Sequence, residues 1–518
     1  MTPELTEIEF DIPQHSGEVF CHPPAAEFEA VARENAERLA ASGLSIDGTP
    51  LREIRHQVRA RVLQRAAAYT GAMGIDVPRP PAGALLLVTG HQPFLFHPGI
   101  WIKHLLAHRL AGSHHAALSL PVDSDAFEEI AADVPVLDGG LRLIRDTLVR
   151  APADVLYEAQ PAPDPASWQA FLRRLDGALR TLNEPEIEAA FRTFVDAASN
   201  VRPAADIGTF LTTVRRRHEG RRRYREVPVS HVSRSPEFMR FFLSILRDSI
   251  RFADAFNRHL DAYRERYNVK TVAQPFSNLE RDGERVELPF WFVHGGRRQS
   301  VYGAREARGW TLSTSGDTIV TIGDGDGPDA LAGIEIRPKA LTLTAFSRLC
   351  VADLFIHGVG GGRYDRVTDA VIADYFGIQP PRYAVVTATL HLPLREHRTG
   401  EERQHLQRRL LELRHNPERV LRQPSSEQQR LIDDKWRLIA SLDGGSLTRR
   451  ERRQATQRIR EINDSLSQVL AESVTEVEGA LQALADAPDA DAAARHRGYP
   501  FCFFPPQAID ALINSLGV

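Results

Sequence analysis

The sequence predicts an α/β protein built around a parallel sheet, and two apolar runs joined by a helical pattern carry that prediction. Residues 84–90 form a short continuous apolar run that ends in glycine, typical of a buried parallel strand. Residues 98–111 begin with Pro98 and are followed by Gly112, as a helix often is. A second apolar run covers residues 116–122. Strand, helix and strand form a βαβ unit, which predicts a parallel sheet.

Composition narrows the class of protein. The chain has 518 residues, of which 42% are hydrophobic and 25% charged, the profile of a globular protein with two to four domains. Its net charge of −4 provides no positive field for a polyanion, so neither nucleic acid nor a membrane is an expected partner. No apolar run approaches the length of a membrane span, and the three cysteines are too scattered for a disulfide framework or a zinc site. A cytoplasmic protein without a bound metal is expected.

Shifts in pattern divide the chain into four parts. Residues 1–80 form a helical segment, and residues 81–394 form the α/β core with a mostly helical insertion at about 140–267. Strands are expected to return after the insertion, the first at Val269–Ala273. An Arg-, Glu- and Leu-rich stretch at 395–487 predicts two long antiparallel helices, a coiled-coil hairpin through which the chain could form a homodimer. The aromatic tail at 488–518 is too apolar to be free and is expected to pack on the core.

The loop after the first strand is the leading candidate for chemistry, because ligands of a parallel sheet bind at the carboxyl ends of its strands. This loop contributes His91 and His97, which could stabilise or protonate a leaving oxygen, and Lys103 follows in the helix. Thr89, Gly90 and Gln92 are candidates for cofactor binding there. The alternative is structural: His97 caps the helix and His91 satisfies backbone groups. The other histidines of the helix, His104 and His108, are expected on the surface.

Acidic residues end the second predicted strand. Asp123 could orient a ribose hydroxyl or an amine, or hold Mg²⁺ through water, and Asp125 is a candidate for substrate binding. Asp125 and Glu128 also have the spacing of a capping box for a helix that begins at Ala126. Asp123 is the better functional candidate, since capping does not require it.

A glycine-rich segment at residues 357–365 is the second focus, and a helix is expected to begin at Tyr364. Its glycines would let the backbone approach a phosphate, although no Walker A lysine follows, and a tight connection is the plain alternative. The candidate cofactor-binding residues in this segment are His357, Gly358, Gly360, Gly361, Gly362, Arg363 and Tyr364, and Asp365 is assigned to the substrate.

Lysine is scarce: only four of the 64 basic residues are lysines. Two of them, Lys103 and Lys339, lie beside predicted ligand loops, so they mark positions where an arginine would not serve. Arg337 and Lys339 could clamp an anionic substrate, although charge at a strand end is also ordinary. The arginines at 215–223 are interpreted as a solvated helix face, because no aromatic residues interleave with them.

Taken in order, these motifs resemble the bacillithiol-biosynthesis cysteine-adding enzyme family (BshC). The resemblance lies in residues 88–92 with Gly99 and Lys103, the acidic segment 123–130, Arg337-Pro338, a Gly-Gly loop with a tyrosine, and the long C-terminal helical stretch. It implies a Rossmann-like, nucleotidyltransferase-type core, a dimer formed through the coiled coil, and the addition of cysteine to a sugar acid. The first loop also resembles the WbqC-like family in its His91-Gln92-Pro93 opening and the glycine and lysine that follow.

Three departures from the cysteine-adding family concern substrate-binding motifs. His91 replaces a glutamine, the Asp-His-Asp-Phe motif carries Ser124 for histidine and an added Ala126, and the Gly-Gly-Pro-Gly-Glu loop loses its glutamate unless Asp365 replaces it. The resemblance therefore supports the fold more than any particular substrate.

The sequence favours an enzyme that joins an amino acid or amine, with cysteine as one candidate, to a small acceptor of sugar-acid type. It leaves the cofactor unknown; a nucleotide such as ATP or ADP with Mg²⁺ is the one that the loops favour. The alternative is a non-catalytic nucleotide-binding or assembly scaffold that uses the coiled coil. The enzyme hypothesis expects His91, His97, Asp123 and the glycine segment 358–362 to line one cleft at the carboxyl edge of the sheet.

Overall fold

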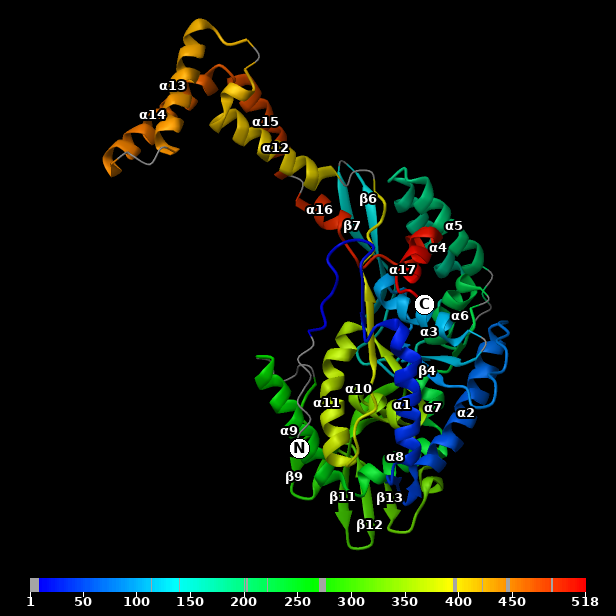
Figure 1. Cartoon of the computed structure of the whole chain (residues 1–518). Coiled ribbons are helices and arrows are strands. Elements are labelled where there is room, and N and C mark those ends of the chain that lie inside the picture. Colours follow the sequence, from blue (N-terminus) through cyan, green and yellow to red (C-terminus); the bar gives the residue numbers. More distant parts are fainter. Residues whose placement is uncertain are drawn as a thin grey trace.

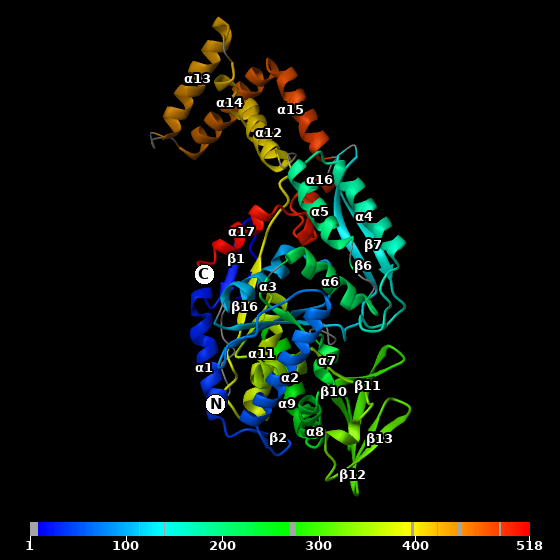
Figure 2. The same cartoon turned by 90° about the vertical axis from the view of Figure 1, so that its right-hand side faces the viewer.

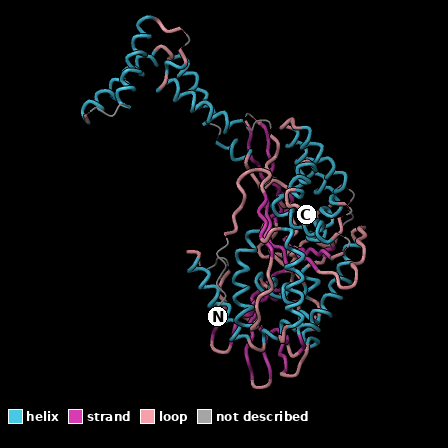
Figure 3. Tube along the Cα trace, viewed as in Figure 1, coloured by secondary structure: helices cyan, strands magenta, loops and turns pink. Residues whose placement is uncertain are grey.

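The computed structural model describes residues 9–112, 114–138, 140–199, 201, 204–220, 222–269, 276–394, 398–421, 423–443, 448–485 and 488–518 (Figure 1). It confirms the α/β class, with helices around the strands of the body and a helical arm at one end (Figure 3). Most of the strand expected at Val269–Ala273, including Lys270, lies outside the described residues.

The central sheet has six strands in the order β1-β16-β15-β4-β5-β8. Neighbouring strands from β16 to β8 are parallel, and β1 pairs antiparallel with β16 at the edge. The strands are β1 (Val19–His22), β4 (Leu86–His91), β5 (Ala116–Pro121), β8 (Arg225–Glu226), β15 (Leu354–His357) and β16 (Ala384–Ala388). The predicted βαβ unit is present, since α3 (Pro98–Ala111) connects the parallel strands β4 and β5.

Two cores cover the two faces of this sheet. Leu87 of β4 packs in one core with α3 and with α1 (Phe28–Ala41), whereas Leu86 and Val88 pack in the other with α2 (Leu51–Ala72) and α11 (Val359–Tyr375). Because successive side chains of a strand alternate between its faces, a strand buried on both sides is apolar throughout. This burial explains the continuous apolar run from which the strand was predicted.

The segment after β5 begins differently from the prediction. The sequence predicts a helix at Ala126 as one alternative and mostly helix from residue 140, but β6 (Glu129–Leu137) and β7 (Leu141–Arg150) form an antiparallel pair here. Alternate residues of β6 are buried from Ile130 to Val134, which is the period of a strand with one covered face. The helices follow only then: α4 (Pro165–Arg180), α5 (Pro185–Ala198), α6 (Ile207–Glu219), α7 (Val229–Ser233), α8 (Pro236–Leu246) and α9 (Ser249–Arg266).

The arginine cluster at 215–223 is not a uniformly solvated face, and that prediction is wrong for its first two members. Arg215 and Arg216 are buried and pair with Glu219 at 3.1 and 2.8 Å, and Arg215 also pairs with Glu226 at 2.6 Å. Buried charges persist only when opposite charges or hydrogen bonds compensate them. These arginines therefore fasten α6 to the edge strand β8.

A second sheet lies at the opposite end of the body from the arm (Figure 2). Its strand order is β13-β12-β11-β10-β14, with β9 beside β10 and every pair antiparallel. The strands are β9 (Arg281–Asp282), β10 (Arg285–His294), β11 (Arg297–Glu306), β12 (Gly309–Ser313), β13 (Thr318–Gly323) and β14 (Ile336–Pro338). The short 3-10 helix η2 (Pro328–Leu331), the helix α10 (Ala340–Phe346) and the π-helical turn η3 (Ser347–Val351) complete the path to β15.

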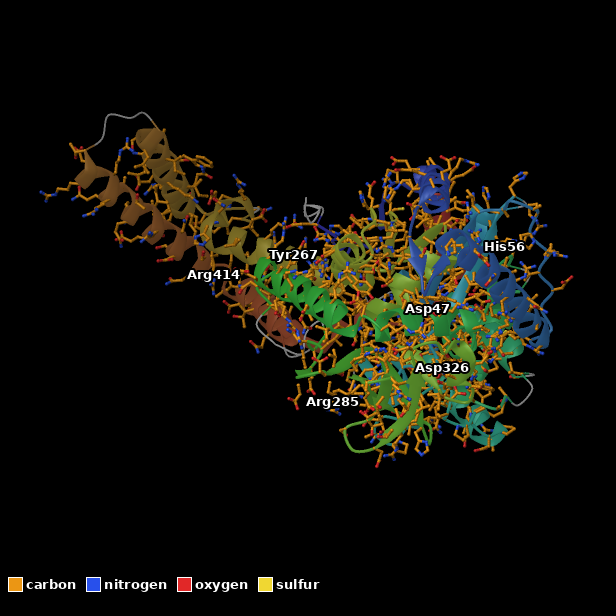
Figure 4. The ribbon with its side chains drawn as sticks, turned by 90° about the horizontal axis from the view of Figure 1, so that it is seen from below. Asp47, His56, Tyr267, Arg285, Asp326 and Arg414 are labelled. Atoms are coloured by element: carbon orange, nitrogen blue, oxygen red, sulfur yellow. The ribbon has the colours of Figure 1, made fainter. Side chains whose placement is uncertain are left out.

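One arginine joins this sheet to the amino-terminal helices. Arg247 donates to the carboxylate of Asp47 and to the carbonyl oxygen of Asp326, which lie close together when the molecule is seen from below (Figure 4). Asp47 lies in the turn between β2 (Ser45–Ile46) and β3 (Thr49–Pro50). The second sheet is thereby held against the body by polar contacts as well as by the shared core.

The described residues of the carboxy-terminal arm form four helices where the sequence predicts two long ones. They are α12 (Arg398–His415), α13 (Ser426–Asp443), α14 (Arg449–Gln468) and α15 (Ala471–Ala485), with the short η4 (Pro417–Arg419) after α12. α12 packs against α15, and α13 packs against α14. The arm extends away from the body (Figures 1 and 2). The predicted breaks at Pro417 and Pro424 fall between these helices, because proline interrupts a helix, and the predicted break at Gly444-Gly445 lies outside the described residues.

The aromatic tail lies inside the body. It consists of α16 (Pro488–Ala494), η5 (Phe501–Phe503) and α17 (Pro506–Asn514). The ring of Phe501 lies 4.7 Å from Trp101 of α3 and 5.8 Å from Phe96, and its backbone N–H donates to the Phe96 carbonyl at 3.0 Å. The tail therefore completes the core beneath the first loop.

We expect Phe501→Ala to lower the free energy of unfolding by about 3–5 kcal/mol, because the substitution removes a fully buried ring and leaves a cavity. Urea unfolding followed by circular dichroism measures this change. His56→Ala on α2 is the control, since His56 is exposed; its change should stay within about 0.5 kcal/mol. A loss below about 1 kcal/mol in Phe501→Ala would contradict the role of the tail in the core.

Candidate functional site

A cavity of about 690 Å³ opens at the carboxyl ends of β4, β5 and β15. The strand ends contribute Gly90, Gln92, Leu120, Val122, Ser124, Asp125, Phe355 and His357, the second sheet contributes Glu287, Trp291, Arg298 and Ser300, and the remaining wall comes from Phe256 and residues 276–280, 338–341, 343 and 344. Ligands of parallel α/β sheets bind at this edge, so the position of the cavity is that of a ligand site.

Opposite charges alternate along the wall that the second sheet contributes. Lys339 Nζ lies 2.6 Å from Glu287 Oε1 and 4.4 Å from the centre of the Trp291 ring. Arg298 lies over the same ring at 4.9 Å and pairs with Asp125 at 2.6 Å. Burial lowers the pKa of Lys339. Burial alone would raise the pKa of Glu287, but the Lys339 ammonium holds it below its usual value.

The sequence prediction found only part of this wall. It named Lys339 and Asp125 but missed Trp291, Arg298 and Glu287, which lie on strands of the second sheet. Trp291 faces Ser300 across the β10–β11 pair, and no local motif marks either residue. A cation stacked on an aromatic ring is favourable, but the pairing becomes visible only when the sheet is assembled.

The first loop contributes Gly90 and Gln92 to the cavity wall, whereas His91 and His97 are not among its lining residues. The ring of His91 packs at 5.2 Å from Phe94 and 5.8 Å from Phe96, and burial lowers its pKa to about 3. His97 accepts a hydrogen bond from the Gly99 N–H at 3.1 Å, as the structural alternative proposed, and burial lowers its pKa to about 4. Both imidazoles are therefore neutral at pH 7.

Other residues of this loop have structural contacts. Thr89 is buried, and its hydroxyl donates to the Ile356 carbonyl at 2.9 Å, which ties β4 to β15. Gln92 donates to Asp125 at 2.9 Å, so one of the three acidic residues of the cavity wall is held by the first loop. His104, expected on the surface, is buried and stacks on Phe96.

Lys103 lies in the core beneath the cavity. It is 2% exposed, and its ammonium donates to the carbonyl oxygen of Gly90 at 2.9 Å. Within the described part of the chain, the structure gives it no carboxylate partner, and burial lowers its pKa to about 7. Its charge also helps to lower the pKa of His91 and His357. An uncompensated buried lysine is uncommon in a core and is typical of functional sites.

Asp123 and Arg337 face away from the predicted cleft and are not among the residues that line the cavity. The buried carboxylate of Asp123 accepts hydrogen bonds from the N–H of Ser230 at 2.9 Å and from its hydroxyl. Burial and the nearby Glu158 raise the Asp123 pKa to about 7. Arg337 is fully buried and binds both oxygens of Glu158 at 2.8 and 2.9 Å. The predicted single cleft is therefore wrong for His91, His97, Asp123 and the glycine segment 358–362, none of which is among the lining residues.

Asp125 does not cap a helix. Its Oδ1 accepts from the Ala126 N–H at 2.9 Å, but the chain continues through a turn into β6. The carboxylate instead joins Gln92 and Arg298 at the cavity wall. Of the two aspartates, the structure therefore brings Asp125 to the cavity, whereas the sequence favoured Asp123.

The glycine-rich segment is not a loop, which corrects the helix start predicted at Tyr364. Gly358 is the N-cap of α11, and the three glycines at 360–362 lie in its first turn. Arg363 donates to the Phe10 carbonyl at 2.6 Å, while Tyr364 is partly exposed and packs at 5.6 Å from Phe276, which lines the cavity. His357 also lines the cavity, and its Nε2 lies 2.9 Å from the Asp365 carboxylate.

Two further properties concern the described residues only. They contain no helix that is both long and apolar enough to span a bilayer. They also contain no group of three or more His, Cys, Asp or Glu side chains that could hold a metal ion. The cavity is lined by carboxylates, cations, an imidazole, amides, hydroxyls and aromatic rings.

The shifted pKa of Lys103 predicts a pH dependence of stability. Between about 7 in the folded protein and the ordinary 10.5, the unfolded chain binds the proton more tightly, so wild-type stability rises with pH in this window. Lys103→Met removes that contribution. The difference in free energy of unfolding, wild type minus Lys103→Met, should therefore increase by about 1.4 kcal/mol per pH unit above about pH 7.

Urea unfolding at about pH 7, 8 and 9 measures this difference. Lys435→Met is the matched control, because Lys435 is equally buried but pairs with Glu418 at 2.8 Å. Its difference from wild type should not rise over the same range. Parallel curves for wild type and Lys103→Met would show that Lys103 is not held uncompensated in the core.

No protein-family model matches the chain, and no curated protein matches it. The similarities to the cysteine-adding enzyme family and to the WbqC-like family therefore stay predictions from short motifs. The cavity has a mixed-charge wall, formed by Asp125, Glu287, Arg298 and Lys339. The ends of three parallel strands also line it.

Proposed function

We propose that the protein is an enzyme that joins an amino acid or amine to a small acid in the cavity at the carboxyl edge of the central sheet. The mixed-charge wall is the observation that carries this proposal. Arg298 and Lys339 supply cations for a carboxylate or phosphate, and Asp125 and Glu287 supply carboxylates for an ammonium group. A site with both signs suits two reactants of opposite charge, or one reactant that carries both.

A ligand can replace the present partners of Arg298 and Asp125 in the cavity wall. Arg298 and Asp125 are each about a quarter to a third exposed, so their pairing is partly screened by water and inexpensive to rearrange. A bound anion would take over Arg298, and a bound ammonium would take over Asp125. The Trp291 ring beside both cations provides an apolar surface for the body of a small ligand.

The volume of the cavity fits small molecules rather than a polymer. Pockets for ligands of drug size span about 300–1,000 Å³, and this one measures about 690 Å³. A nucleotide such as ATP or ADP is the proposed cofactor, and Mg²⁺ bound to its phosphates commonly takes one or two protein carboxylates. Asp125, Glu280 and Glu287 are the carboxylates in the cavity wall that could serve.

The remaining parts of the proposal follow the motif resemblance. The central sheet would be a Rossmann-like, nucleotidyltransferase-type core, cysteine would be one candidate amine, and a sugar acid the acceptor. The arm would act as a coiled coil in a homodimer, a role supported by Leu411, Trp436 and Val469, which are large apolar side chains exposed on it. The three free cysteines suit a cytoplasmic protein.

Ligand-dependent thermal stability tests the proposal. ATP, ADP, AMP, CTP and cysteine are added singly at millimolar concentration, and at least one should raise the melting temperature by several degrees. A ligand at 100 times its Kd adds about 2.7 kcal/mol to the stability of the folded state. Lys339→Ala and Arg298→Ala should reduce this shift, because each removes a cation from the wall.

His56→Ala is the control, since His56 is exposed on α2, away from the second sheet (Figure 4). It should keep the full shift. If none of the five compounds moves the melting temperature, the enzyme proposal loses its support, and a non-catalytic scaffold built around the arm becomes the better description.

A further inference from the structure

His357 and Asp365 form a buried pair at the edge of the cavity. His357 is the last residue of β15, and Asp365 lies in the second turn of α11, which begins directly after it. His357 Nε2 lies 2.9 Å from Asp365 Oδ2, and Arg348 lies 2.7 Å from the same oxygen. All three side chains are at most 6% exposed, so water does not compete for these contacts.

Asp365 fixes which imidazole nitrogen carries the hydrogen. Burial alone would raise the pKa of Asp365, but Arg348 and His357 hold it well below its usual range. Asp365 is therefore a carboxylate and can only accept a hydrogen bond. The Nε2 of His357 must carry the hydrogen that it donates, which leaves the lone pair of a neutral imidazole on Nδ1.

The glycines of α11 leave space beside Nδ1. A Cβ at Gly361 would lie 2.8 Å from Nδ1, closer than such atoms approach in proteins, whereas positions 358 and 360 face open space. Gly360 and Gly361 are exposed, and the structure gives Nδ1 no hydrogen-bond partner among the described residues. The glycine-rich turn thus has a second explanation besides phosphate binding: it makes room beside an imidazole.

We propose that His357 is the general base of the joining reaction and that Asp365 is the residue that positions it. This inference rests on the proposed function, in which an amine reacts with a small acid. The imidazole lines the cavity through which such a substrate would enter, and the aspartate-held tautomer offers Nδ1 as the proton acceptor.

The proposed step takes a carboxylic acid activated as an acyl phosphate by a nucleoside triphosphate. The amine nitrogen forms a bond to the acyl carbon, the bond from that carbon to the phosphate oxygen breaks, and the electron pair leaves with the phosphate. The proton of the amine moves to Nδ1. The imidazolium that results is stabilised by the Asp365 carboxylate on its other side.

The charged groups around the imidazole agree with this role. Asp365 faces it from α11, Arg348 from η3 and Lys103 from α3. Burial lowers the pKa of His357, and the charges of Arg348 and Lys103 act in the same direction, while Asp365 opposes them. The imidazole is therefore unprotonated near pH 7, as a base must be.

Carbethoxylation by diethyl pyrocarbonate tests the pair without knowledge of the substrate. The reagent acylates unprotonated, accessible imidazoles, and peptide mass spectrometry locates the product. We expect His357 to react in the folded protein. Asp365→Asn should change its rate and the pH profile of that rate, because an amide can also donate to Nε2 and release the tautomer. Gly361→Ala should slow the reaction at His357, because the added methyl group covers Nδ1.

Asp369→Asn is the matched control. Asp369 also pairs with Arg348 but does not contact His357, so this variant should keep the wild-type reactivity of His357. His56, which is exposed, serves as the internal reference in every sample. If His357 stays unmodified in the folded protein, or if Asp365→Asn and Asp369→Asn behave alike, the proposal is overturned.

A turnover assay distinguishes a failure of this inference from a failure of the proposed function. Phosphate release from ATP is measured with cysteine and a panel of small hydroxy and sugar acids. With any active combination, His357→Gln should lose about 100-fold or more in kcat while keeping the thermal shift caused by ATP. Full kcat in His357→Gln overturns the role of the base. Absence of turnover in wild type with every combination counts against the joining reaction, while the carbethoxylation result still decides whether the pair exists.

Discussion

Parallel pairing of β4 with β15 on one side and β5 on the other is the constraint on which the site depends. Ile356 faces Thr89, and Gly90 faces Leu120, so the three strands end at one edge. A Cβ at Gly90 would lie 2.8 Å from the Leu120 carbonyl oxygen, which explains why glycine occupies this position of β4, one residue before the strand ends. Residues that are far apart in the sequence reach the same cavity only because this register holds.

The partner of each buried cation sets Lys103 apart from the buried arginines of this protein. Arg216 and Arg337 are fully buried, and each meets a carboxylate at 2.8 Å, which offsets the cost of removing a guanidinium from water. Lys103 is nearly as deeply buried but meets only a carbonyl oxygen. Such a lysine lowers stability near neutral pH, and its retention beneath the cavity is easier to understand as a requirement of the site than of the fold.

Local pattern was enough to predict the βαβ unit, because a buried strand and a helix each leave a signal within a dozen residues. The face of the sheet to which each side chain points was harder to predict. β4 extends through His91, and neighbours along a strand point to opposite faces, so Gly90 and Gln92 reach the cavity while His91 packs against Phe96. The prediction treated His91 as part of a loop and could not assign its side.

Most of the contacts that could not be predicted join residues that are distant in the sequence. The mixed-charge wall combines Asp125 with residues of the second sheet about 160 to 210 positions later, and its members carry no shared motif. Arg215 was interpreted as solvated because no aromatic residues interleave with its basic cluster, yet Glu226, eleven positions on, compensates its charge. A run of like charges in the sequence says little about burial when the opposite charges come from another element.

The place of Phe501 against Phe96 has a consequence for synthesis of the chain. The floor of the first loop is completed by a segment that follows it by about four hundred residues, after the whole helical arm. A ribosome adds about 5–20 residues per second, so the apolar underside of the loop stays uncovered for roughly 20–80 seconds. During that time the nascent body has a sheet but an unfinished core, and its exposed rings are natural binding sites for a chaperone.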